Sequence, residues 1–230
     1  MLTLFHHTMI AGCRHVRLIL GEYGEEISLI EEKPWVRRKE FLQINPAGTL
    51  PLLLAEHDAP IPGAMVIAEY LDETRGALMR GKRLFADDPF ERAEIRRLCE
   101  WYLVKCEAEV TRHMVRERVF KPMMPASIGG GSPEAAALRA ARGNVRQHMK
   151  YTNWLAANRD WLAGPSITYA DMAAGAAISI LDYLGEIEWN DYPAARDWYA
   201  RLKSRPAFRP LLTERVQGLP PVSHYPDPDF

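Results

Sequence analysis

Cysteine is scarce in this chain, with Cys13, Cys99 and Cys106 the only three in 230 residues. Cys99 and Cys106 fall on one expected helix, about 10 Å apart along its axis, which is too far for a disulfide. The sequence therefore excludes a disulfide framework and predicts a reducing, cytoplasmic location. The seven histidines are scattered with no paired spacing typical of metal ligands, so we expect no metal site and no cofactor of that kind.

The chain also lacks an excess of positive charge and any long hydrophobic run. Lys and Arg number 29 against 30 Asp and Glu, which gives a formal net charge of −1. A general nucleic-acid binder needs a clear excess of cations, so we expect no nucleic-acid partner. No apolar run approaches the roughly 20 residues that span a bilayer, so we expect no membrane insertion. Residues 1–5 lack a basic region and are expected to form a strand, not a signal peptide.

The first 80 residues alternate short strand patterns with helical periodicity. Their order, β-α-β-α-β-β-α, is that of a thioredoxin-like domain. The expected strands cover 2–5, 26–31, 50–55 and a hairpin strand at 60–61, and the expected helices cover 16–23, 37–43 and 63–74. We therefore predict a thioredoxin-like domain over residues 1–80.

Beyond a charged linker at 81–88, nearly all periodicity is helical, which predicts an all-helical domain over 89–212. Long helices are expected over 90–120 and 134–158, joined by a mobile loop with three consecutive glycines. Thr168 and Asp171 have the spacing of a capping box and predict the start of a buried helix. A last helix is expected over 193–204. Residues 213–230 are rich in proline and should form an extended tail.

Five blocks of sequence, taken in order, resemble those of glutathione transferases. They are LFHHTMIAGCRHVRLIL (4–20), NPAGTLP (45–51), IPGAMVIAEYL (61–71), WLAGPSITYADM (161–172) and YPAARDWYARLKSRPAF (192–208). The resemblance covers roughly residues 1–210. It implies the glutathione transferase fold, an α/β thioredoxin-like domain followed by an all-α C-terminal helical bundle.

In that family, the positions of Pro62 and Gly63 carry an acidic or amide residue followed by Ser or Thr, which hold the γ-glutamyl end of glutathione. Here the hydroxyl is missing and proline removes a donor. Leu50 and Pro51 match the family's cis-proline pair, whose backbone contacts the cysteinyl part of glutathione. Losing one or two charged hydrogen bonds weakens binding by roughly ten-fold to ten-thousand-fold. We therefore expect no glutathione cofactor, although the Gly63 N–H could still hold an anion weakly.

The resemblance places the thiol-activating group at Ile10 in serine- and cysteine-type members, and near His6 in tyrosine-type members. Ile10 cannot donate a hydrogen bond, and His6 stays an alternative contact for a sulfur. Cys13 lies at the start of the first helix, where the helix dipole favours a thiolate. The favoured interpretation is a cysteine that packs inward, with a redox role as the alternative. We thus expect no catalytic residue and a vestigial ligand site formed by Ile10, Cys13, Leu50, Pro51, Pro62 and Gly63.

The tail is the first of three candidate partner surfaces. Its end combines aromatic and acidic side chains, which suits a partner's pocket. These residues are Tyr225, Asp227, Asp229 and Phe230. The alternative is a tail that folds back over the cleft between the domains.

Two further surfaces carry cations. One lies near the end of the first long helix and consists of Arg112, His113, Arg116, Arg118 and Lys121. A solvated helix end is the alternative, because cations there complement the helix dipole. The other is Trp35, which is followed by three cations and has the composition of an interface anchor. Its alternative is a half-buried Trp that packs on the second domain.

Within the family, the length, the missing motifs and the tail are most similar to division factors of alphaproteobacteria that bind the tubulin-like GTPase FtsZ. That resemblance implies a non-catalytic cytoplasmic homodimer, recruited to the division site, that binds FtsZ filaments and alters their curvature or bundling. One alternative is a glutathione-dependent transferase or thiol reductase that uses Cys13 or His6. Another is an RNA polymerase-associated scaffold of the stringent starvation type, whose members tend to keep the acidic-Ser pair.

Overall fold

The computed structural model describes residues 2–79, 81 and 83–228 of the chain. Its first part is a four-stranded sheet in the order β2-β1-β3-β4. The strands are β1 (Leu2–His6), β2 (Ile27–Glu31), β3 (Leu52–Leu54) and β4 (Pro60–Pro62). β1 runs parallel to β2 and antiparallel to β3, and β3 is antiparallel to β4. This mixed sheet is that of a thioredoxin-like domain, as the alternating sequence pattern predicts.

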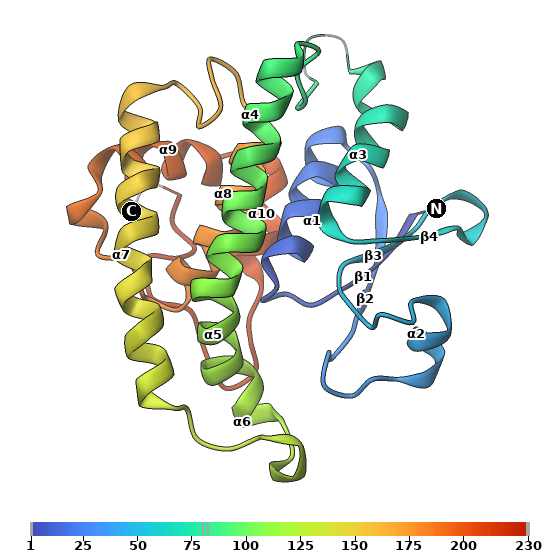
Figure 1. Cartoon of the computed structure of the whole chain (residues 1–230), viewed down its shortest axis with the longest axis vertical. Coiled ribbons are helices and arrows are strands. Elements are labelled where there is room, and N and C mark those ends of the chain that lie inside the picture. The colour runs from blue at the N-terminus through green and yellow to red at the C-terminus, as the bar shows by residue number, and fades with distance from the viewer. Residues whose placement is uncertain (1, 80, 82, 229–230) are drawn as a thin grey trace.

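Three helices flank the sheet (Figure 1). They are α1 (Ala11–Tyr23), α2 (Lys39–Ile44) and α3 (Ala64–Thr74). Successive strand residues point to opposite faces, so Leu4 joins the main core, to which α1 and α3 contribute, while Phe5 faces the other way. Phe5 packs on Phe41 of α2, with ring centroids 5.5 Å apart. The helices therefore cover both faces of the sheet.

The second part begins with a nearly continuous helical rod. It contains α4 (Pro89–Glu100), α5 (Arg112–Val115) and α6 (Lys121–Met123), joined through π-helical segments at Trp101–Lys105, Glu107–Thr111 and Arg116–Phe120. Asp88 caps its start, because its carboxylate accepts hydrogen bonds from the N–H groups of Phe90 and Glu91. The sequence predicts a helix over 90–120 but not its π turns, since each adds only one residue to the repeat.

Four more helices complete the helical part. They are α7 (Ala135–Asn158), α8 (Tyr169–Tyr183), α9 (Pro193–Lys203) and α10 (Arg209–Thr213). α8 is buried along its whole length. Its capping box at Thr168 and Asp171 is confirmed. Small residues let neighbours approach closely, and a Cβ on Gly175 would meet Leu202 at 2.3 Å. Buried α8 is thus the centre of the bundle, as its small, apolar sequence predicts.

The remaining short elements are 3₁₀ turns at Glu56–Asp58, Gly76–Leu78, Ala126–Ile128, Trp189–Asp191 and Pro206–Phe208. The expected strand over 50–55 is shorter than predicted, because Ala55 already turns back and its N–H donates to the carbonyl of Ala59 at 3.0 Å.

Within the described residues, no helix combines the length and the apolar composition needed to cross a membrane.

Candidate binding cleft

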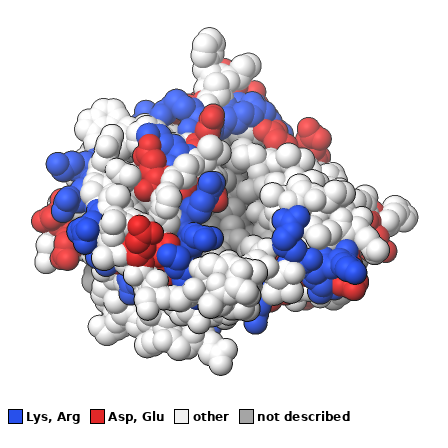
Figure 2. All heavy atoms as spheres, turned by 60° about the horizontal axis from the view of Figure 1, so that its bottom comes forward, with Lys and Arg blue, Asp and Glu red and all other residues white. Residues whose placement is uncertain are grey.

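A cavity of about 340 Å³ lies between the two halves of the molecule. One wall is formed by the loop after β1 and the loop after β2, and the other by the helical rod. Figure 2 shows the surface hollowed between two lobes, with Lys and Arg side chains on both sides of the hollow. We call this cavity the cleft. It lies beside Ile10, where the family resemblance places the thiol-activating group.

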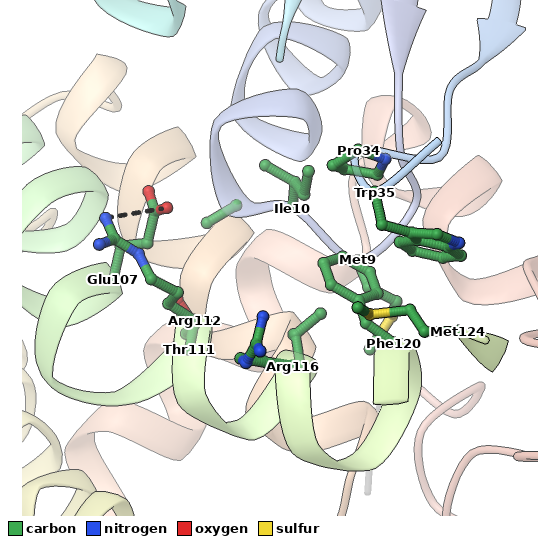
Figure 3. A pocket seen from close by; sticks show the side chains of 12 residues that line it. Met9, Ile10, Pro34, Trp35, Glu107, Thr111, Arg112, Arg116, Phe120 and Met124 are labelled. Atoms are coloured by element: carbon green, nitrogen blue, oxygen red, sulfur yellow. Dashed lines mark ion pairs between the residues drawn. The ribbon is translucent and has the colours of Figure 1, made fainter. Parts of the chain in front are cut away.

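One end of the cleft is apolar. Trp35 packs on Phe120 of the rod, with ring centroids 5.0 Å apart, and Met9 and Met124 gather around the two rings (Figure 3). His7 lies edge-on to Phe120 at 4.9 Å between centroids, and burial lowers its pKa to about 4, so its ring is neutral near pH 7. Trp35 is half-buried against the second domain, which agrees with the alternative interpretation of this residue.

The other end of the cleft is charged. Arg112 and Arg116 lie on neighbouring turns of the rod and both line the cavity (Figure 3). A Glu107 oxygen lies 3.6 Å from Arg112 Nη2, and burial raises the pKa of Glu107. Among the described residues no carboxylate comes within ion-pair distance of Arg116. The cleft is therefore amphipathic, with an aromatic end and a guanidinium end.

The thiol-activating position is filled by an aliphatic side chain. Ile10 lines the cavity, and its carbonyl accepts hydrogen bonds from the N–H groups of Cys13 and Arg14 at the start of α1. Cys13 is fully buried, and this burial raises its thiol pKa to about 12. A thiol with that pKa stays protonated at physiological pH and is a poor nucleophile. The structure supports the inward-packing interpretation of Cys13.

His6 is not available to a ligand in the cleft. Its side chain is buried, and it does not contribute to the cavity lining. Burial lowers its pKa to about 4. The alternative in which His6 contacts a glutathione sulfur is therefore contradicted by its position.

The glutathione-binding frame keeps its backbone shape but not its donors. The Leu50–Pro51 peptide is cis, as the resemblance implies. Gly63 has a φ of 96° at the start of α3, and its N–H donates to the carbonyl of Pro51 at 3.0 Å. The expectation that this N–H could hold an anion is wrong, because an internal hydrogen bond already uses it. Pro62 is exposed at the sheet edge and donates nothing.

The basic stretch divides into two groups. Arg112 and Arg116 face the cleft, and His113 is exposed. Arg118 instead donates to the Leu184 carbonyl and to Glu186, each at 2.7 Å, and Lys121 donates to Glu117 at 2.6 Å. Arg118 therefore joins the rod to the end of α8, and Lys121 is paired along the rod with Glu117, which corrects their assignment to a free partner surface.

The tail folds back onto the helical part. Tyr225 is completely buried, donates to the Leu211 carbonyl at 3.1 Å and accepts from Arg14 Nη1 at 3.2 Å. Its assignment as an exposed partner contact is therefore wrong. Asp227 is exposed, whereas Asp229 and Phe230 lie outside the described residues.

Met124, Glu107 and Arg14 are among the residues of this region that escaped sequence reasoning. Met124 and Glu107 reach the cleft only because the rod passes it, and the rod's path depends on its π turns. Arg14 is fully buried, and it donates to Ser179 Oγ at 2.7 Å as well as to Tyr225. Its partners lie 165 and 211 positions away in the sequence. No local pattern signals such a contact.

Comparisons with known proteins agree with this architecture. The family models for the N-terminal and C-terminal domains of glutathione S-transferases match residues 12–74 and 113–206. The chain is 38% identical to FtsZ-localized protein A of Caulobacter vibrioides over 231 residues, which covers 99% of this chain and 98% of that protein.

Solved structures are similar over the whole chain. A glutathione S-transferase from Sinorhizobium meliloti is 60% identical with a TM-score of 0.98, and the two chains cover each other completely. FzlA from C. crescentus is 38% identical with a TM-score of 0.91, covering 100% of this chain and 99% of that one. The similarity therefore includes both domains and the tail region.

Proposed function

Since the chain belongs to the glutathione S-transferase family, we propose that it is a non-catalytic member that acts in cell division by binding FtsZ filaments. The carrying observation is the 38% identity to FtsZ-localized protein A over nearly the full length of both chains. In this proposal the protein works in the cytoplasm at the division site and changes the curvature or bundling of the filaments. It uses no cofactor.

The state of the thiol site supports a non-catalytic role. Glutathione chemistry needs a donor near the sulfur and anchors for the γ-glutamyl end. Ile10 occupies the first position, and the Gly63 N–H is bonded to Pro51. Cys13 cannot substitute, because burial keeps it protonated. Each group that glutathione chemistry would need is replaced, buried or already engaged in an internal hydrogen bond.

The mouth of the cleft is the surface we propose for the filament. Trp35, Arg112 and Arg116 lie on it, and all three were candidates from the sequence. Exposed guanidinium groups beside an aromatic ring suit an acidic protein surface, where they guide association and supply anchoring contacts. Asp227, exposed on the tail, stays a second candidate contact.

A homodimer fits exposed apolar side chains of both domains. Val66 of α3, Phe90 of α4, Val104 of the rod and Trp154 of α7 have exposed fractions of 56% to 86%. A second copy covering these side chains would remove them from water. Two copies would also present two filament sites, and the linked sites would add avidity along a repeating polymer.

Co-sedimentation with GTP-assembled FtsZ tests the proposal. We expect the protein to pellet with polymer and to stay in the supernatant with unpolymerised FtsZ. Variants of the cleft arginines are compared with a variant of Arg139, an exposed arginine of α7 outside the cleft, which is changed to Glu. Failure of the unmodified protein to pellet across a range of salt would contradict filament binding.

A residual transferase activity is the second candidate, favoured by the 60% identical structure that bears the name glutathione S-transferase. Conjugation of glutathione to a model electrophile tests it. Turnover above the uncatalysed rate would favour an enzyme over the proposed adaptor.

A further inference from the structure

The two free edges of the sheet are protected very differently. β4 has three residues, and two of them are Pro60 and Pro62, which blunt that edge. β2 has five residues without proline or lysine, and it pairs with β1 in unbroken register from Ile27 to Glu31. Natural proteins usually guard such an edge, because its unpaired backbone groups can join another strand. The β2 edge has neither proline nor lysine to protect it in this way.

Exposed apolar side chains and a groove accompany this edge. Leu29 and Ile30 are 42% and 37% exposed. A groove of about 260 Å³ runs beside β2. Its apolar lining comes from α1, β2 and the segment around α10: Leu20, Ile27, Leu29, Ala207, Pro210 and Leu211. Side chains of an added strand would find an apolar surface there.

The hydrogen-bond pattern shows which backbone groups are free. The N–H of Glu32 donates to the carbonyl of His6 at 2.8 Å, so residue 32 faces β1. In a parallel pair the bonding direction alternates along the strand, so Ser28 and Ile30 also face β1. The N–H and C=O of Leu29 then point to the free edge, while its side chain lines the groove. Leu29 thus offers backbone and apolar contacts together.

Charge at the ends of β2 selects the occupant. Glu26 precedes the strand and is exposed, with no cation within ion-pair distance among the described residues. Glu31 at the other end has a side chain 57% exposed, and its neighbour His7, 3.9 Å away, is neutral near pH 7. An antiparallel second copy would bring these acidic ends together, and like charges on paired strands repel. The edge is complementary to a basic segment.

We propose that the free edge of β2 binds an extended segment of a partner protein, apolar at alternate positions and basic at both ends. The segment adds a fifth strand beside β2, exchanges main-chain hydrogen bonds with Leu29 and Glu31, and buries its apolar side chains in the groove. Its basic ends pair with Glu26 and Glu31. This site is separate from the cleft and does not depend on filament binding.

Fluorescence anisotropy with a labelled peptide, Lys-Thr-Val-Thr-Val-Thr-Lys, tests the site on the full chain. We expect saturable binding that is weakened about tenfold or more by Leu29→Lys, which places a cation at the edge and in the groove. The same change at Ile128, which is 47% exposed in the Ala126–Ile128 turn of the helical part, should leave the affinity unchanged. Glu26→Lys alters only an exposed side chain and should also weaken binding.

Amide exchange followed by NMR supplies the second readout. Bound peptide should slow exchange at the Leu29 and Glu31 amides and leave Ile30, already paired with β1, unchanged. Absence of saturable binding would overturn the proposal. Equal affinity for the Leu29→Lys, Glu26→Lys and Ile128→Lys proteins, or slowed exchange that avoids β2, would also overturn it.

Discussion

The first-domain wall of the cleft consists of backbone and apolar side chains, whereas the helical wall carries the charge. On the first wall, Ile10 replaces a donor. Gly63 does not line the cleft and its N–H is bonded to Pro51, so little remains on this side to hold a polar ligand. On the helical wall, Arg112 and Arg116 stay exposed. The difference teaches that a fold can keep the shape of a thiol site after its donors are used internally, while the opposite wall stays open to a new partner.

The largest expected effect concerns the buried thiol near the first wall. Burial raises the Cys13 pKa to about 12, so its thiolate forms only as the pH rises through that value. At pH 8 we expect alkylation of native protein roughly a thousandfold slower than for an exposed cysteine. Mass spectrometry after timed iodoacetamide treatment measures the rate. Labelling of Cys13 as fast in native as in urea-unfolded protein would mean that the thiol is accessible.

Charge reversal on the helical wall should have the next largest effect. Arg112→Glu combined with Arg116→Glu should weaken FtsZ polymer binding by about ten- to hundredfold, because both anchoring cations become repulsive to an acidic surface. Binding isotherms from pelleting measure the change. Arg139→Glu combined with Arg146→Glu, two exposed arginines of α7 outside the cleft, is the control of equal charge. If the double variant and the control bind alike, the cleft does not contact the filament.

Restoring family residues at the start of α3 should fail to restore glutathione binding. Pro62→Glu with Gly63→Ser returns the missing side chains, but the residue 63 N–H is still bonded to Pro51. A non-glycine residue at φ 96° and ψ 134°, a sparsely populated region of backbone conformation, also costs about 1–3 kcal/mol. Calorimetry and thermal melts test both points. Gly218→Ser, at φ 75° in open space, controls for backbone strain alone. Micromolar glutathione binding by the restored variant would show that only side chains had been missing.

The smallest effect is expected outside both walls. Asp227→Lys should leave the unfolding free energy within about 0.5 kcal/mol, because the side chain is exposed. It should reduce filament affinity only a few fold if the tail contributes. Urea unfolding and pelleting measure the two quantities. Unchanged affinity removes the tail from the contact surface, and a large loss of stability would mean that Asp227 supports the tail's packing.

Local patterns were sufficient for much of the fold. Strand alternation, the capping box at Thr168 and the small residues of α8 each act over a few positions, so the sequence reveals them directly. The family resemblance added the cis peptide at Pro51 and the missing donors at Ile10 and Gly63.

Long-range contacts determined what could not be foreseen. The sequence suggests that Tyr225 is a free aromatic side chain of the tail. In the fold, buried Arg14 donates a hydrogen bond to its hydroxyl. Arg118 looks like a member of one basic patch, yet the turns of the rod direct it to Glu186, 68 positions away. Lys121 pairs with Glu117 four residues before it, a contact that helical spacing does encode. Which cations stay exposed depends on how the helices pack, and the sequence pattern does not encode that at short range.

Pelleting with GTP-assembled FtsZ in the presence of excess glutathione tests the central claim most directly. A partner-binding protein with a disabled thiol site should sediment with the polymer equally well with and without glutathione. Protein that stays in the supernatant, or that glutathione releases from the polymer, would contradict this account.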